Sequence, residues 1–402
     1  MTSPSNATED PAGPVLAGRE IRWPLLLVLA ALAAVAPVAT DLYLPGFPAI
    51  GSELGVDASG VQLTLTSFLI GMAVGQLVMG PLSDRFGRRN PLIVSVVVSV
   101  VAGVACAVAP TLPLLVAARL VQGLAGAGGM VIGRAVIADL ATGRAAARAF
   151  TLMLTVGGVA PVLAPSVGGV LAGPVGWRGM LWAVALLSVA LLVAVIAVVP
   201  ETHTPAGGTA SFAGALRSVA GSRGYRAPVA VFAFSFAVMM AYIAASPFLY
   251  QNVVGLSEIG YGVLFGVNAA GLIGAGAVAG RLVRRVDPAR MIRWCLAVQV
   301  AATVSFLVLA VAGAPVWTFP VAVFVAVTAN GGIMGNSAAL AMAEVREVAG
   351  TGSAVLGFGQ FALGAAVSPL VGLGGADSAV VPAAVMAAAS LLAGTAARRL
   401  PK

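Results

Sequence analysis

Long apolar runs alternate with short polar segments along most of the chain, and this pattern predicts membrane-spanning helices. A helix needs about 20 predominantly apolar residues to cross a bilayer. Because lipid offers the backbone no hydrogen-bond partners, each such run is expected to be a helix and not an open strand. The runs are also too long for the strands, about 10 residues each, of an outer-membrane barrel. Twelve runs qualify, at approximately 23–45, 61–81, 91–109, 113–138, 150–173, 178–199, 227–249, 260–280, 291–313, 316–340, 354–373 and 379–397.

Polar segments divide the twelve predicted spans into two groups of six. Residues 1–21 are polar and are expected to form a disordered tail, since a secretory signal would have a basic start and a shorter apolar core. The longest internal polar stretch, residues 200–226, predicts a linker between the sixth and seventh spans. Residues 22–199 and 227–402 are therefore predicted to form two six-helix bundles. Duplicated bundles are a usual transporter layout, with the substrate site at the midplane between them.

The composition agrees with this fold class and excludes several functions. The chain is 60% hydrophobic and only 9% charged, whereas a soluble domain is about half apolar and a quarter charged. Cys106 and Cys295 lie in apolar runs and form no metal or redox spacing. The single histidine, His203, lies beside Glu201 in the predicted linker. There is also no glycine-rich phosphate loop with its Lys and Ser/Thr. We therefore expect no enzyme activity, no metal and no cofactor.

The net charge of +8 reflects where the arginines lie. With a cytoplasmic N-terminus and twelve spans, cytoplasmic segments hold 19 of the 22 Lys and Arg residues. Outside lies Arg178, while Arg119 and Arg134 fall within the fourth span. By the positive-inside rule both termini are expected in the cytoplasm, with the chain in the plasma membrane. Because the charges are spread over many loops, we expect no nucleic acid as a partner. The membrane spans make the lipid bilayer a partner. We also expect a monomer.

The segment GPLSDRFGRR, residues 80–89, follows the second predicted span and is the most specific local pattern. Its glycines allow a tight bend, Asp84 can face a helix N-terminus, and Arg85 and Arg88 can hold the loop at the membrane interface. The ten-residue pattern resembles the signature of the loop between helices 2 and 3 in the major facilitator superfamily.

Further segments resemble one branch of that superfamily, the bicyclomycin/chloramphenicol-resistance (Bcr/CflA-type) drug:proton antiporters. The matching segments are TDLYLP at 40–45, RLVQG at 119–123, GVAPVLAPSVGG at 158–169 and GWR at 176–178. The resemblance extends over nearly the whole chain after residue 22. It implies an all-α fold of 12 transmembrane helices in two pseudo-symmetric bundles, proton-driven efflux, and small hydrophobic drug-like substrates.

An uptake symporter of a small metabolite with the same fold is the alternative function. We expect it less, because a sugar site would need more buried amides and carboxylates, and an anion site would need paired cavity arginines. A multidrug pump and a dedicated self-resistance exporter would share all of the features above.

The fifth predicted span combines prolines with small residues. Pro161 and Pro165 free backbone carbonyls and bend the helix, and Gly157, Gly168 and Gly169 allow another helix to approach closely. The resemblance implies that this segment is the antiporter motif, which is associated with exporters. The alternative is ordinary Gly/Pro-rich packing between membrane helices.

Two ionisable residues inside the spans are candidates for proton coupling. Asp41 follows the uncharged run 23–40, and a charged side chain at a helix centre costs about 2.5–3.5 kcal/mol. A buried carboxyl that is easily protonated is a candidate proton carrier. The resemblance implies that Asp41 and Arg119 act together in proton and substrate coupling. Alternatively, Asp41 caps the first span at the outer interface and Arg119 is purely structural.

A second charged group lies at the cytoplasmic side. The resemblance implies that Asp139, near the end of the fourth span, pairs with Arg88 beside Asp84. With Arg85, these residues would form a latch that closes the cytoplasmic side in the outward-open state. Asp139 could equally be a simple interface charge.

Scattered polar and flexible side chains within the spans are candidates for lining a central cavity. Some of them are expected instead to be hydrogen bonds between helices, worth about 0.6 kcal/mol on average, or ordinary core packing. The candidates are Tyr43, Gln62, Gln122, Met239, Tyr242, Asn268, Asn330 and Gln360.

Overall fold

The computed structural model describes residues 21–141, 143–203, 212–283, 285–345 and 348–400. The predicted tail up to residue 20 and residues 204–211 of the predicted linker lie outside the described residues. Every regular element of the described part is a helix. The elements are α1 (Trp23–Asp41), η1 (Leu44–Gly46), α2 (Phe47–Leu54), α3 (Ala58–Phe86), α4 (Arg89–Val108), α5 (Leu112–Leu140), α6 (Gly143–Val198), α7 (Phe212–Gly221), α8 (Arg223–Phe248), η2 (Leu249–Val253), α9 (Glu258–Leu282), α10 (Pro288–Val311), α11 (Thr318–Ala343), α12 (Ala349–Gly372) and α13 (Val380–Ala397).

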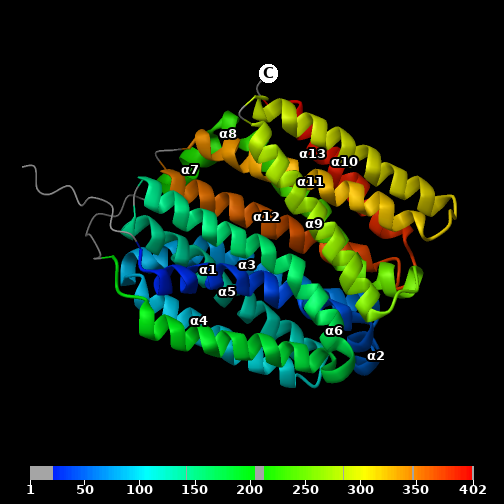
Figure 1. The fold of residues 1–402 in the computed structure, drawn as a ribbon, viewed down its shortest axis with the longest axis horizontal. Coiled ribbons are helices and arrows are strands. Elements are labelled where there is room, and N and C mark those ends of the chain that lie inside the picture. The colour runs from blue at the N-terminus through cyan, green and yellow to red at the C-terminus, as the bar shows by residue number, and fades with distance from the viewer. Residues whose placement is uncertain (1–20, 142, 204–211, 284, 346–347, 401–402) are drawn as a thin grey trace, which may run out of the picture.

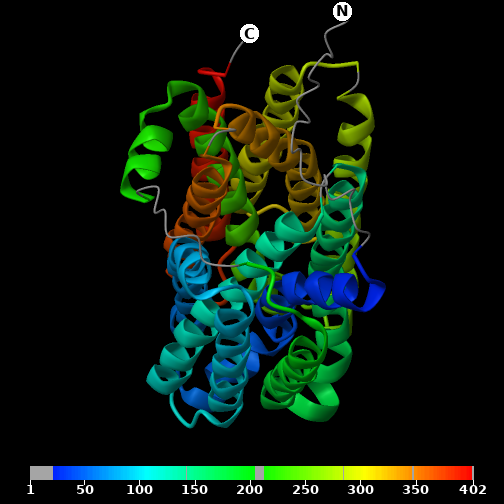
Figure 2. The ribbon, with the colours of Figure 1, turned by 90° about the vertical axis from the view of Figure 1, so that its left-hand side faces the viewer.

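The helices form two bundles, which we call the N half (α1–α6) and the C half (α8–α13) (Figure 1). In the N half α3 packs on α5 and α1 on α6, and in the C half α10 packs on α11 and α8 on α13. The halves meet along two seams, where α3 packs against α12 and α6 against α9. Turned by 90°, the N half occupies the lower part of the view and the C half the upper part (Figure 2).

Eleven helical segments of the described residues are long and apolar enough to cross a membrane. One of the helices concerned, α6, contains the fifth and sixth predicted spans. Its backbone leaves the helical conformation at Gly176, where φ is 62°, a left-handed value that glycine adopts without steric cost. There the chain reverses direction (Figure 1). With α6 counted as two segments, the described residues have twelve helical segments of the kind that the sequence predicts, and two of them are joined without a loop.

The first predicted span, 23–45, is not a single helix. The α-helix ends at Asp41, a short 3₁₀ turn follows, and α2 continues to Leu54. Pro45 has no backbone N–H to extend the helical hydrogen bonding. Gly46 allows α6 to approach, because a Cβ atom there would lie 2.7 Å from the Cβ atom of Trp177. The break leaves Asp41 as the last residue of α1, directly before the 3₁₀ turn, and we call this place the Asp41 corner.

The hydrophobic core is continuous between the halves at one end of the molecule and divided at the other. We call the end that carries α2 the α2 end, and the opposite end, where α6 stops and α8 begins, the linker end. At the α2 end one cluster of buried residues includes side chains from both halves, and the rings of Phe47 and Phe248 lie 6.2 Å apart between centroids. At the linker end separate clusters belong to the N half and the C half. The halves are therefore packed together mainly at the α2 end.

Hydrogen bonds between the halves reinforce this closure at the α2 end. The Gln62 amide donates to the Ala244 carbonyl at 3.1 Å, and the Gln251 amide donates to the Pro45 carbonyl at 3.1 Å. The Ser166 hydroxyl donates to the Gly262 carbonyl at 2.9 Å. Opening the molecule at this end requires all three to break.

Candidate functional site

The Asp41 carboxyl lies inside the protein, at the seam between the halves. Its residue is only 3% exposed. It interacts electrostatically with Arg119 of α5 in its own half and with Tyr261 of α9 in the other half. The corner at the end of α1 thus points a carboxyl group at the place where the two bundles meet.

Arg119 is completely buried and is held by neutral groups. Its Nη1 atom donates to the Ala39 carbonyl at 2.9 Å and to Oε1 of Gln122 at 2.8 Å. Its guanidinium carbon lies 4.4 Å from the ring centroid of Tyr43 and 4.5 Å from that of Phe68, distances typical of cation–π contacts. These contacts fix the arginine in one orientation.

The electrostatic balance between Asp41 and Arg119 is incomplete. Among the described residues the two side chains form no ion pair, and Nη2 of Arg119 has no hydrogen-bond partner. A buried polar atom without a partner is costly. The arginine can therefore respond to a change of charge on Asp41, which a rigid ion pair would resist.

A cluster of tyrosines from the C half faces this corner. The chain has five tyrosines in all, and Tyr242, Tyr250 and Tyr261 are buried together beside the seam. Asn268 donates to the hydroxyl groups of Tyr242 and Tyr250, at 2.9 and 3.0 Å. The Ser246 and Tyr261 hydroxyls lie 3.2 Å apart. The sequence predicts Tyr242 and Asn268 in the site, and the structure adds Tyr250 and Tyr261.

Several of the predicted cavity residues hold helices together. The amide of Asn330 donates to the Ser235 carbonyl at 3.2 Å, between α11 and α8, and Gln62 binds across the seam as described above. Met239 and Gln360 are half-buried. Their role in lining a substrate cavity stays a prediction.

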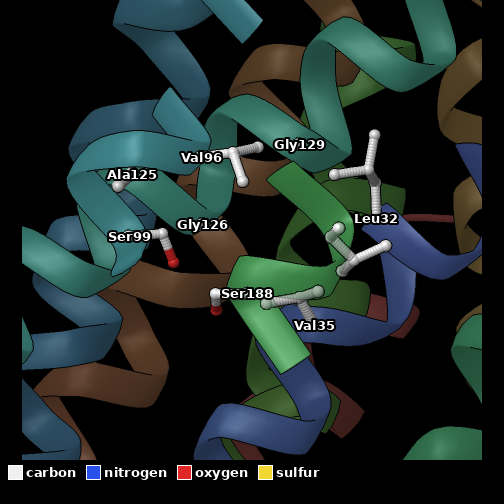
Figure 3. Close-up of a pocket in the computed structure, with 9 residues that line it drawn as sticks. Leu32, Val35, Val96, Ser99, Ala125, Gly126, Gly129 and Ser188 are labelled. Atoms are coloured by element: carbon white, nitrogen blue, oxygen red, sulfur yellow. The ribbon is translucent and has the colours of Figure 1, made fainter. Parts of the chain in front are cut away.

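The N half also contains a small internal cavity between α1, α4, α5 and α6 (Figure 3). Its volume is about 20 Å³, enough for roughly one water molecule. Ser99 and Ser188 line one side of it and Leu32 and Val35 the other. The cavity is too small for a drug-like molecule.

At the linker end Arg88 connects three side chains. Its Nε atom donates to Oδ2 of Asp139 at 2.9 Å, and its Nη1 atom donates to the Ser83 hydroxyl at 2.8 Å. Nη1 also forms an ion pair with Asp84. Arg85 does not join this group, since its guanidinium lies over the Phe86 ring at 5.3 Å. The arrangement brings together the loop after α3 and the end of α5. Its action as a latch stays a prediction.

Glu201, just after α6, is a member of this group that sequence reasoning missed. Partial burial raises the pKa of its carboxyl, but hydrogen bonds from four backbone N–H groups outweigh that effect and leave the pKa below its ordinary value. Two of these donors belong to the N-terminus of α4, where such groups lack helical partners. The donors are the N–H groups of Arg88 (2.7 Å), Arg89 (3.0 Å), Thr202 (3.0 Å) and His203 (3.1 Å).

Replacing Glu201 by glutamine should lower the stability of the protein by about 0.3–1 kcal/mol at neutral pH, the usual worth of an exposed acid at a helix N-terminus. Because folding lowers the pKa of Glu201, its ionised form stabilises the fold above the unfolded pKa of about 4.3. That contribution is lost as the pH falls through the lower folded value. Thermal unfolding of both proteins from pH 7 to pH 3 should show the difference disappear. A difference that persists at pH 3 would contradict this account.

The glycines of the predicted antiporter motif allow close approach to both sides of the seam. A Cβ atom at Gly168 would overlap the Leu42 carbonyl oxygen, directly after Asp41. A Cβ atom at Gly169 would collide with the Glu258 carbonyl oxygen at the start of α9. At Gly157 it would lie 3.9 Å from the Cβ atom of Ala33, an ordinary contact. Pro161 and Pro165 lie within the same helix. The motif therefore packs α6 against the Asp41 corner and against the C half.

Comparison with known proteins identifies the family. Residues 29–369 match the family model described as the Major Facilitator Superfamily. The uncharacterized MFS-type transporter YdgK of Bacillus subtilis (strain 168) is 33% identical over 365 residues, which cover 89% of this chain and 90% of that protein. A bicyclomycin resistance protein homolog of Haemophilus influenzae is 28% identical over 356 residues, covering 86% and 88%.

The arrangement of the helices is also found in a solved transporter structure. The xylose transporter XylE from E. coli, in a partially occluded inward-open conformation, superposes with a TM-score of 0.71. The superposition covers 92% of this chain and 96% of XylE at 15% identity, so it shows a shared fold and no more. The chain is a multi-pass membrane protein and belongs to the Major Facilitator Superfamily of transporters.

Proposed function

We propose that this chain exports small hydrophobic molecules, antibiotics among them, across the plasma membrane in exchange for protons. The observation that carries the proposal is the position of Asp41, a 3%-exposed carboxyl at the seam between two bundles. The similarity to a bicyclomycin resistance protein homolog supports export of drug-like cargo. The concentration of arginines in the segments at the linker end supports a cytoplasmic placement of that end and of both termini.

Protonation of Asp41 would be coupled to the opening of the seam. An ionised carboxyl in a low-dielectric site is costly unless a cation or a hydrogen bond balances it. Among the described residues, Thr40 supplies a hydrogen bond to the Asp41 carboxyl and Arg119 supplies a positive charge. When Asp41 takes up a proton, Arg119 loses its counter-charge, and the packing of α1, α5 and α9 around the pair changes in free energy. Any ligand that prefers one packing then shifts the proton affinity of Asp41. Protonation of Asp41 shifts the affinity for that ligand by the same factor, since such coupling is reciprocal.

The proton gradient supplies the energy for export. Moving one charge through 100 mV is worth about 2.3 kcal/mol, and a pH difference adds to it. In the proposed cycle a proton from outside occupies Asp41 while cargo leaves, and release of that proton to the cytoplasm allows new cargo to bind. The proton and the cargo compete for the transporter, so the two never cross the membrane in the same direction.

The experiment uses everted membrane vesicles from a pump-deficient strain that expresses the chain. With an acidic lumen, adding a transported drug should release protons, seen as dequenching of a pH-sensitive dye. A panel of hydrophobic antibiotics identifies the responsive drugs, and the same panel is scored for growth protection with and without a protonophore. Vesicles from cells with the empty vector are the control.

Two outcomes would contradict the proposal. The first is protection that persists unchanged when the protonophore removes the gradient. The second is drug-induced proton movement in the opposite direction, which would indicate a symporter. The monomeric state, also part of the proposal, is tested by light scattering of the purified protein.

A further inference from the structure

A third ionisable residue lies within the membrane-spanning part of the N half and has no role in the cycle above. Arg134 of α5 is at the linker end, where it faces α3 of its own half and α12 of the C half. Its Nη2 atom donates to Oε1 of Gln76 at 3.2 Å, and its Nη1 atom donates to the Ser353 hydroxyl of the C half at 3.4 Å. Nε donates to the carbonyl of Met130 in its own helix at 3.1 Å.

All of these partners are neutral. Among the described residues no carboxylate lies within ion-pair distance of Arg134. The two bonds to side chains are also longer than the usual 2.7–2.9 Å of charge-assisted hydrogen bonds. A carboxylate or similar group on a ligand would make shorter, stronger bonds to the same guanidinium, in the two-pronged geometry that arginine favours.

Arg134 differs from Asp41 and Arg119 in accessibility. Asp41 and Arg119 are 3% and 0% exposed, whereas Arg134 is only half-buried. It also lies at the end where the hydrophobic cores of the two halves are separate. The Ser353 side chain opposite it is half-buried as well. A molecule that enters between the halves from the linker end therefore meets this arginine before it meets the proton-coupling pair.

The interior charges do not cancel. Three charged side chains lie within the membrane-spanning part of the N half: Asp41 at the end of α1, and Arg119 and Arg134 along α5. Their sum is positive when Asp41 is ionised and more positive when it carries a proton. In a low-dielectric interior such an excess repels cations strongly.

We propose that Arg134 binds the acidic or hydrogen-bond-accepting group of the cargo, so that this transporter takes anionic and neutral hydrophobic molecules and rejects cations. The inference rests on the proposed function only in requiring that cargo binds between the halves. Arg134 acts here as a specificity-determining residue, and the Gln76 and Ser353 side chains are the neutral acceptors that the cargo displaces.

The test measures binding to the purified full-length chain with three probes that share one ring system. The probes are 2-naphthoate (anion), 2-naphthylmethanol (neutral) and 2-naphthylmethylammonium (cation). Apparent Kd values come from the shift of the thermal unfolding midpoint with probe concentration. We expect the naphthoate to bind at least 10-fold more tightly than the ammonium. In Arg134→Gln the binding of naphthoate should weaken at least fivefold. The binding of the alcohol should weaken less than twofold, because the glutamine amide can still donate a hydrogen bond to a neutral acceptor.

Two further variants distinguish a specific contact between Arg134 and the probe from an effect of the protein's net charge and from misfolding. Arg134→Lys keeps the positive charge and should keep most of the preference for the anion. Arg281→Gln removes the same charge from an exposed position at the end of α9 and should change no Kd. Equal binding of naphthoate and ammonium by the natural chain, or an unchanged naphthoate-to-ammonium ratio in Arg134→Gln, would overturn the proposal. Because binding is measured without a gradient, a failure of proton coupling would leave this result intact.

Discussion

Asp41→Asn is expected to abolish drug-induced proton release in everted vesicles while the protein still folds. Asparagine has nearly the same shape as aspartate but takes up no proton, so the seam loses the group whose charge changes during the cycle. The unfolding free energy should change by about 1 kcal/mol or less, because the neutral amide is easier to bury than a carboxylate. Export against a gradient should fall to the level of vesicles without the chain.

Asp57→Asn is the matched control for this substitution. Asp57 caps α3, where its Oδ1 atom accepts from the Gly60 N–H at 2.7 Å, and asparagine is an equally good N-cap. This variant should transport normally. If Asp41→Asn exports at the natural rate with the natural pH dependence, Asp41 is not the proton carrier and the proposed cycle is wrong.

Gly168→Ala is expected to have the second large effect, on both stability and transport. The added methyl group would overlap the Leu42 carbonyl oxygen, so α6 must move away from the Asp41 corner. Overpacking of this kind costs about 1–3 kcal/mol. The shift also loosens the packing of the N half around Asp41, and proton-coupled export should fall with it.

Gly157→Ala tests the same change in the same helix without the collision. Its methyl group would make an ordinary contact with Ala33, and alanine in place of a helical glycine stabilises by about 0.5–1 kcal/mol. Thermal unfolding in detergent should therefore move in opposite directions for the two variants. Equal behaviour of both would mean that the close approach at Gly168 has no special role.

The sequence was sufficient for the overall architecture because bilayer thickness imposes a length on every apolar run. It predicted twelve crossings, the division into two bundles and the superfamily. It did not predict the end of α1 at Asp41, because the apolar run continues through Pro45 into α2. Nor did it predict the continuous join at Gly176, which depends on one backbone angle.

The site was only partly accessible to sequence reasoning. Asp41 and Arg119 could be found because charge is rare within the spans. Tyr261 could not be linked to Asp41, because it lies more than 200 positions away and meets Asp41 only after the halves pack. Tyr250 joins the cluster through its ring contact with Tyr261. Tyrosine is scarce in this chain, and that scarcity was the available signal. Glu201 was missed because its partners are backbone N–H groups, which have no sequence pattern.

The shared core at the α2 end has a consequence for inhibitor design. Phe47 and Phe248 lie in one buried cluster there, so a compound arriving from that face meets packed side chains and finds no entrance. With the linker end in the cytoplasm, as proposed above, blockers selected for high affinity to this arrangement will have to permeate the cell first and act from the linker end. Compounds that stay outside can then only trap the molecule after it has rearranged, and their potency will rise with the rate at which the transporter turns over.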